Sequence, residues 1–152
     1  MNYLFPLITA IIGAVAGYFL SLNKEIKIMK RQEVTKAKDN IIIGINDFII
    51  KVEYNNFGNG KTRLYNIIDN LPIIKGLLKS NIIHLKSSAS VNIMEAYENY
   101  ENPNIPNGIT LDHPFKIYGM NKETFKKYTN FKHKSGTEYA IYNLNKILEI
   151  IN

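Results

Sequence analysis

The stretch from Tyr3 to Leu22 reads YLFPLITAIIGAVAGYFLSL and contains no charged side chain. Twenty residues of α-helix rise about 30 Å, which matches the hydrocarbon core of a bilayer. Pro6 falls in the first turn of such a helix, where its missing N–H breaks no helical hydrogen bond. The stretch therefore predicts one N-terminal transmembrane helix, with residues 1–23 as the membrane anchor.

A cleaved signal peptide is the main alternative to an anchor. It needs a positively charged region before the apolar core and a small-x-small cleavage site after it. No Lys or Arg precedes Lys24, and the exit sequence from Leu20 to Asn23, LSLN, is not such a site. A buried helix of a soluble protein is a second alternative, but a charge-free stretch of bilayer length favours the anchor.

The basic residues that flank this stretch lie on one side only. Lys24, Lys27, Lys30 and Arg31 follow it, whereas only the α-amino group precedes it. The positive-inside rule then places the N-terminus outside and the C-terminal domain in the cytoplasm, with the chain in the cell (inner) membrane. We interpret the four residues as basic groups at the surface of the lipid bilayer, although a topology signal alone would explain them.

Small residues recur within the predicted span. Gly13 and Gly17 form a G-x-x-x-G pair, and Ala10 and Ala14 form a second small-xxx-small pair. Small side chains let two helices approach closely in lipid. The pattern predicts association with a second copy or with the span of another protein, while the general abundance of Gly and Ala in membrane helices is the simpler explanation.

After the span, no Gly or Pro interrupts the chain from Tyr18 to Ile43. We expect the helix to continue as a basic juxtamembrane stalk over residues 24–40. Apolar residues then recur at helical spacing, three and four apart, and four further isoleucines widen that face. A strand remains an alternative for this β-branched run. The predicted face consists of Val34, Ala37, Ile41, Ile45, Phe48 and Val52, widened by Ile42, Ile43, Ile49 and Ile50.

The remaining sequence predicts a small helical domain over residues 41–152. We expect a helix from Lys61 that ends or bends at Pro72, a continuation to Lys86, and a helix over 91–100 capped by Ser90. Asn121 would cap a short helix to residue 127, and Ser135 with Glu138 would open the last one. Residues 109–120 suit a short β or irregular segment. The predicted fold class is mainly α.

Composition restricts the possible functions. The chain has 152 residues, 19 basic and 13 acidic, and no Cys, which excludes disulfides and zinc–thiolate sites. Of the basic residues, 17 are Lys, while Ile occurs 25 times and Asn 20 times, a bias typical of A/T-rich codons. Because Arg rather than Lys dominates phosphate and base recognition, the +6 charge does not by itself predict nucleic-acid binding.

No motif commits the chain to a reaction. The sequence GNGKT at residues 58–62 ends like a phosphate-binding P-loop, but its first Gly would fall at Asn55 and the preceding element is helical. His84, His113 and His133 are far apart, and Asp112-His113-Pro114 suits a turn. We therefore predict no enzyme, no cofactor and no metal site.

Tyrosines crowd the second half of the chain among lysines. Such aromatics can stack on single-stranded bases or contact a protein partner, but they most often pack in a core. The tyrosines are Tyr97, Tyr100, Tyr118, Tyr128, Tyr139 and Tyr142.

These observations favour a single-pass, membrane-anchored interaction or scaffold module. One alternative is a membrane-active or regulatory protein of a phage or mobile element that works through association of its span. Another is a membrane-anchored enzyme whose site the sequence does not reveal.

Overall fold

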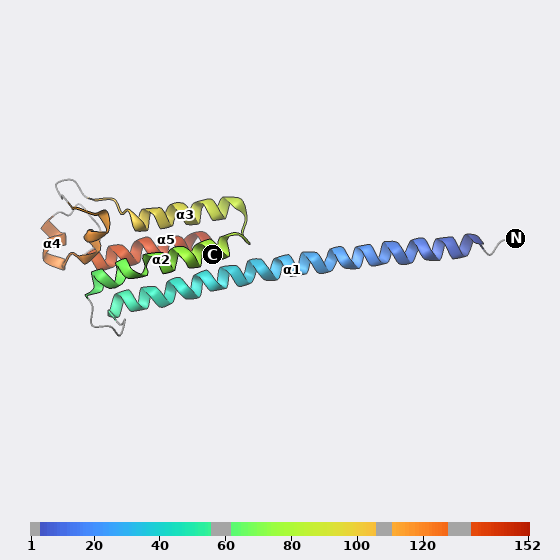
Figure 1. The fold of residues 1–152 in the computed structure, drawn as a ribbon, viewed down its shortest axis with the longest axis horizontal. Coiled ribbons are helices and arrows are strands. Elements are labelled where there is room, and N and C mark those ends of the chain that lie inside the picture. Colours follow the sequence, from blue (N-terminus) through green and yellow to red (C-terminus); the bar gives the residue numbers. More distant parts are fainter. Residues whose placement is uncertain (1–3, 56–61, 106–110, 128–134) are drawn as a thin grey trace. The chain divides into compact units, whose positions relative to one another are not determined.

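The computed structural model describes residues 4–55, 62–105, 111–127 and 135–152, without the side chains of residues 4–7 and 127. The described residues form helices and no strand, which confirms the mainly α prediction (Figure 1). Contacts divide the chain into unit 1, residues 1–36, and unit 2, residues 37–152. The helices are α1 (Leu4–Tyr54), α2 (Arg63–Ile82), α3 (Ser87–Glu101), the 3-10 helix η1 (Pro114–Gly119), α4 (Lys122–Lys127) and α5 (Gly136–Ile151).

Unit 1 consists of the first part of α1. Every described side chain from Ile8 to Glu33 is exposed, so this part of the helix has no core of its own. The predicted span begins at Tyr3, and Tyr3 and the side chains of residues 4–7 lie outside what the structure describes. Across the residues that are described, we find no helix with enough length and apolar character to cross a membrane. The transmembrane part of the predicted fold is therefore unsupported.

Unit 2 has a continuous hydrophobic core to which the second part of α1 contributes. Ala37, Ile41, Ile45, Phe48 and Val52 are all at most 5% exposed, so the predicted helical face is confirmed at these five positions, whereas Val34, in unit 1, is only partly buried. The predicted widening of that face is wrong at two positions, because Ile43 and Ile50 are 66% and 56% exposed. A helix advances about 100° per residue, which turns these two side chains away from the face through Ile41 and Ile45.

The helix α2 does not end at Pro72. Pro72 lies inside it, on its exposed side, while Ile67, Leu71, Ile74 and Leu78 form one buried face on both sides of the proline. An internal proline costs roughly 3 kcal/mol in an isolated helix. Burial of the aliphatic face on both sides of it offsets that cost, since each buried Leu or Ile side chain contributes about 1.5–3 kcal/mol.

The start of α3 differs from the predicted one by about one turn. The helix begins at Ser87, after Lys86 at the N-cap, so Ser90 is not the cap residue. Instead, the Ser90 hydroxyl donates to the carbonyl oxygen of Ile82, at 2.8 Å. This bond ties the first turn of α3 to the last turn of α2, and the hydroxyl acts in it as a donor, whereas in a cap it would accept from a backbone N–H.

The region predicted as short strand or irregular forms η1. Its last residues approach α5 closely, because a Cβ on Gly136 would lie 2.2 Å from the carbonyl oxygen of Ile117. The Gly136 N–H donates to the carbonyl oxygen of Met120, at 3.2 Å. The predicted α4 and its Asn121 cap are confirmed, as is the Ser135 cap of α5, which accepts from the Glu138 N–H at 3.3 Å.

Candidate functional site

The residues predicted to mediate helix association all lie in the exposed part of α1. A Cβ built on Gly13 or Gly17 would have nothing within 4 Å apart from its chain neighbours and the backbone of its own helix. Ala10 and Ala14 are exposed as well. The small side chains thus leave room for a second helix, and the association itself stays a prediction.

The residues predicted to lie at the membrane surface occupy the same helix. Lys24, Lys27, Lys30 and Arg31 are all exposed. The carbonyl oxygen of Arg31 accepts a hydrogen bond from the Thr35 hydroxyl, at 3.1 Å, within the helix. Their assignment to a lipid surface stays a prediction.

The sequence motifs considered for catalysis do not converge. Residues 58–61 of the GNGKT stretch and His133 lie outside the described residues, and Thr62 is the N-cap residue of α2 without a side-chain capping bond. The imidazole of His113 stacks on Phe115, and Asp112 pairs with Lys116. Among the residues that the structure does describe, no three His, Asp or Glu side chains gather as metal ligands.

Four of the six tyrosines belong to the core of unit 2. Tyr97, Tyr100, Tyr118 and Tyr139 are between 0 and 6% exposed, so ordinary packing explains them. The Tyr97 hydroxyl donates to the carbonyl oxygen of Leu71 at 3.0 Å, and the Tyr118 hydroxyl donates to the backbone carbonyl oxygen of Tyr100 at 2.8 Å. Among the remaining two, Tyr142 is 42% exposed and Tyr128 lies outside the described residues.

Burial changes the acidity of these phenols. It raises the pKa of Tyr97 to about 12, with a smaller contribution from the negative charge of Glu101. Burial also raises the pKa of Tyr100 and that of Tyr118. For Tyr118, the hydrogen bond from Asn143 lowers the pKa, but by less than burial raises it. The phenols of this cluster are therefore neutral at physiological pH and contribute packing and hydrogen bonds rather than proton transfer.

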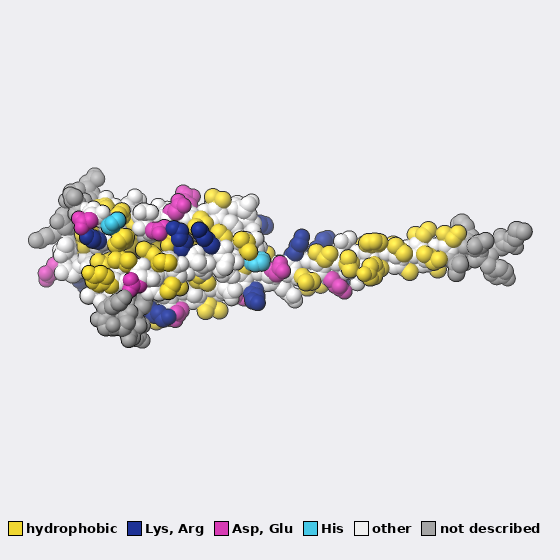
Figure 2. Space-filling view, viewed as in Figure 1, with side chains coloured by type: hydrophobic (Ala, Val, Ile, Leu, Met, Phe, Trp, Pro, Cys, Tyr) yellow, Lys and Arg dark blue, Asp and Glu magenta, His cyan; other side chains and the backbone are white. Residues whose placement is uncertain are grey.

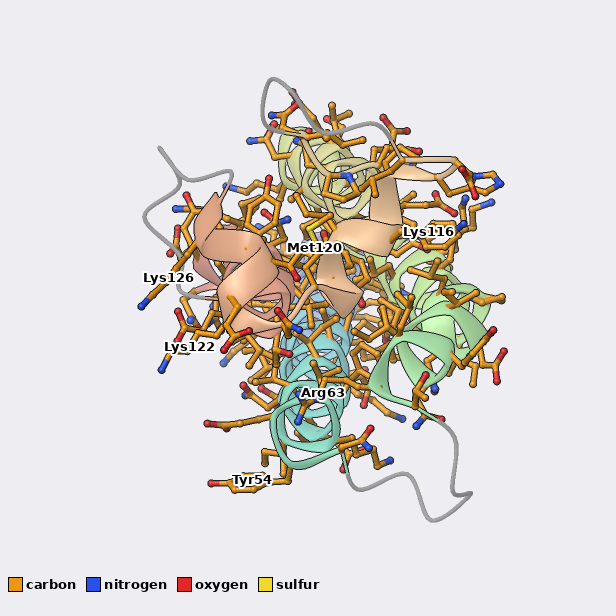
Figure 3. The ribbon with its side chains drawn as sticks, turned by 90° about the vertical axis from the view of Figure 1, so that its left-hand side faces the viewer. Tyr54, Arg63, Lys116, Met120, Lys122 and Lys126 are labelled. Atoms are coloured by element: carbon orange, nitrogen blue, oxygen red, sulfur yellow. The ribbon has the colours of Figure 1, made fainter. Side chains whose placement is uncertain are left out.

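A cavity of about 740 Å³ lies at the end of unit 2 that carries Arg63. The Arg63 guanidinium joins three elements there, since Nη2 donates to the carbonyl oxygen of Glu53 and Nη1 donates to the Thr137 hydroxyl, both at 3.1 Å. In Figure 3, Arg63 lies centrally, between Tyr54 and Met120, while Lys122 and Lys126 point outward on one side. Because Glu53 and Glu138 also line this cavity, its charge is balanced and gives no preference for an anion.

The exposed side of α3 has a different character. We call it the α3 ridge, formed by Val91, Asn92, Glu95, Glu98 and Asn99, all of which are exposed. A groove of about 570 Å³ lies on its α2 side and one of about 480 Å³ on its α5 side, and Glu95 lines both. The first is lined largely by apolar groups. The second is mixed, because apolar and aromatic side chains line it together with amides, the carboxylates of Glu95 and Glu149, and the ammonium group of Lys146.

This ridge was missed in the sequence, although a signal for it is present. Asn92, Glu95 and Asn99 recur at spacings of three and four, opposite the buried Ile93, Tyr97 and Tyr100 of the same helix. The pattern marks a polar helix face, but the grooves that flank it need α2 and α5 as their other walls. The tertiary structure alone defines the site.

Comparison of this chain with protein-family models, with curated proteins and with solved structures finds no match. The function therefore has to be inferred from the residues and the geometry described above.

Proposed function

We propose that the chain is a single-pass membrane-anchored interaction module. Residues 1–23 form the anchor, residues 24–40 a basic juxtamembrane stalk, and residues 41–152 a cytoplasmic helical domain that binds a protein partner. No catalytic activity and no cofactor are part of the proposal.

One observation carries the proposal: an extended run of apolar side chains in unit 1 faces solvent. Ile8, Ile12 and Phe19 are 51%, 63% and 58% exposed, and no charged residue occurs from residue 8 to residue 23. Figure 2 shows apolar side chains in yellow along this part of the chain, with charged side chains only farther toward the C-terminus. Large contiguous apolar patches on proteins mark surfaces that another protein or a membrane covers.

A bilayer suits this patch better than a groove on another protein. The apolar side chains point to all sides of the helix, as Ile11, Ile12, Val15 and Leu20 are each at least 50% exposed. A helix that is apolar all round needs an apolar environment on every side. Together with the residues from Leu4 to Leu7, the uncharged stretch reaches the length of a transmembrane helix.

The sidedness of the proposal follows from charge. Lys24, Lys27, Lys30 and Arg31 would lie at the cytoplasmic surface, where anionic lipid attracts each by roughly 1 kcal/mol. The helical domain would then be held near the inner leaflet. Tethering of this kind raises the effective concentration of a domain for a partner at the same surface, which gives the anchor a role in binding.

Membrane fractionation of the full chain tests the anchor and its orientation together. We expect the chain to stay in the membrane pellet after extraction with alkaline carbonate. A tag fused after Asn152 should resist protease added outside intact cells and be cleaved once the membrane is opened. Recovery in the soluble fraction would refute the anchor, whereas cleavage in intact cells would refute only the orientation.

Association of the span is a second candidate function, favoured by the open space around Gly13 and Gly17. If the span serves only as a tether, G13I/G17I should preserve function and crosslinking between copies should be absent in the native chain. If association is the mechanism, the native chain should crosslink within the membrane and the double variant should lose both the crosslink and function.

A further inference from the structure

The C-terminal half of α3 carries an unusual concentration of negative charge. Glu95, Glu98 and Glu101 lie in its last two turns, and the helix contains no Lys or Arg. The C-terminal end of a helix carries partial negative charge, which disfavours carboxylates in the last turn, here those of Glu98 and Glu101. This arrangement lowers the stability of α3 in a chain whose net charge is +6.

Among the residues that the structure describes, one of these three carboxylates is in an ion pair. Glu101 forms an ion pair with Lys75 of α2, with 2.9 Å between Oε2 and Nζ. The side chains of Glu95 and Glu98 are exposed, and within the described ranges neither has an ion pair or hydrogen bond. Two free carboxylates therefore stand side by side on the α3 ridge, one helical turn apart.

Apolar groups lie next to these two carboxylates. Val91 is 63% exposed, and it lines, with Met94 and with Ile82, the last residue of α2, the groove that Glu95 and Glu98 also line. On the other side of the ridge, Asn92 and Asn99 line the second groove. Their amides offer both donors and acceptors, which is the complement of a peptide backbone.

We propose that the α3 ridge and its groove toward α2 bind a cationic segment of another protein. Lysine or arginine side chains of the partner would pair with Glu95 and Glu98, and an aliphatic side chain would enter the groove beside Val91 and Met94. The charge excludes nucleic acid here, because phosphates would face two carboxylates. The proposal rests on the interaction role proposed above and names the partner's chemistry, but it does not depend on the anchor.

A peptide-binding experiment on the full chain tests this proposal. The chain is reconstituted in nanodiscs of zwitterionic lipid, and binding of fluorescein-labelled Lys-Lys-Ala-Leu-Lys-Lys-Ala-Lys is followed by anisotropy, with empty nanodiscs subtracted. We expect E95Q/E98Q to weaken binding by about 10-fold, which corresponds to about 1.4 kcal/mol. The matched control E25Q/E123Q removes the same charge from exposed positions elsewhere and should change binding less than about 2-fold, because screening weakens distant charges.

Thermal unfolding separates lost binding from lost folding. E95Q/E98Q should unfold at the same temperature as the native chain or higher, because both side chains are exposed and the charge of Glu98 is disfavoured in the last turn of α3. Three results would each overturn the proposal: binding of the same peptide with Glu in place of Lys as tightly, equal weakening by both double variants, or no weakening by E95Q/E98Q. If the chain fails to enter nanodiscs, the anchor is refuted, and the same titration in buffer still tests the ridge.

Discussion

The two parts of α1 have the same backbone conformation but opposite surroundings. In unit 1, from Ile8 to Glu33, every described side chain is exposed, and the apolar ones are spread around the helix. In unit 2, from Ala37 to Tyr54, the buried side chains form one face, and Ile43 and Ile50 remain on the other. Both parts are helical, so helix propensity does not determine what a helix packs against. The distribution of apolar residues around the helix determines it.

Charged substitutions in the apolar part of unit 1 should have the largest effect, which is a loss of membrane insertion. If unit 1 is solvated by lipid, I12K/V15K should cost about 5–7 kcal/mol of membrane insertion, since a lysine near the centre of a span costs about 2.5–3.5 kcal/mol. The chain should then move to the soluble fraction on carbonate extraction, with the helical circular dichroism of unit 2 retained.

The matched control for that variant places the same two lysines in unit 2. I43K/I50K also replaces exposed aliphatic residues of α1 and should leave the chain in the membrane pellet. If both variants fractionate alike, the two parts of α1 do not differ in their solvent, and the anchor is refuted.

Truncation of a buried and of an exposed isoleucine should separate the two sides of α1 in unit 2 by their effects on the free energy of unfolding. Ile45 is 0% exposed, so Ile45→Ala should lower the free energy of unfolding by about 2–5 kcal/mol through lost burial and a residual cavity. Ile43→Ala, two residues away and 66% exposed, should change it by no more than about 0.5 kcal/mol. Urea denaturation followed by tyrosine fluorescence measures both, and equal effects would contradict the helical face.

Glycines provide a similar contrast between the two units, with a smaller effect. Gly136→Ala should destabilise unit 2 by about 1–3 kcal/mol, because its Cβ would meet the Ile117 carbonyl oxygen and force the backbone to shift. Gly17→Ala adds a Cβ in open space and should keep or raise helix content. Thermal melts of the two variants compare them directly, and a stable Gly136→Ala would show that α5 and η1 are not closely packed there.

Alkaline pH should produce the smallest effect, confined to unit 2. An unfolded tyrosine ionises near pH 10, whereas the pKa of buried Tyr97 is raised to about 12, so between these values only the unfolded chain loses this proton. Stability is therefore complete below pH 10 and falls as pH rises through the window, by about 1.4 kcal/mol at pH 11 from Tyr97 alone.

Urea denaturation at pH 9 and pH 11 measures that fall. Tyr97→Phe should reduce it, while Tyr18→Phe, which removes an exposed tyrosine of unit 1, should leave it unchanged. A fall that is the same in the native chain and in Tyr97→Phe would contradict the shielding of this phenol.

The helices of unit 2 could be predicted because their signals are local. The spacing of Ile41, Ile45 and Phe48 defines a face, and the caps at Asn121 and Ser135 need only the following three residues. The cap predicted at Ser90 is wrong, and of the two alternatives predicted at Pro72, an end or a bend, the end is wrong. Ser90 uses its hydroxyl to bind Ile82 rather than to cap α3, and Pro72 lies in a helix whose buried face continues past it.

The candidate site could not be predicted from the same signals. Glu95 and Glu98 are visible in the sequence, but only the structure shows that Lys75 pairs with Glu101 and that, among the described residues, neither Glu95 nor Glu98 has an ion pair. The grooves beside α3 likewise depend on which helices flank it. For Tyr97, Tyr100 and Tyr118 the sequence left contact with a partner or with nucleic acid open beside core packing, and their burial supports core packing.

The two ends of unit 2 meet, because the Lys38 side chain donates a hydrogen bond to the carbonyl oxygen of Ile151. A domain whose first and last residues are neighbours can be inserted into a loop of a host protein without stretching either connection. Residues 37–152 could therefore be inserted into another protein as one unit. A circular permutant that joins Asn152 to Ala37 through a short linker and opens between α2 and α3 would present the α3 ridge at a new chain terminus.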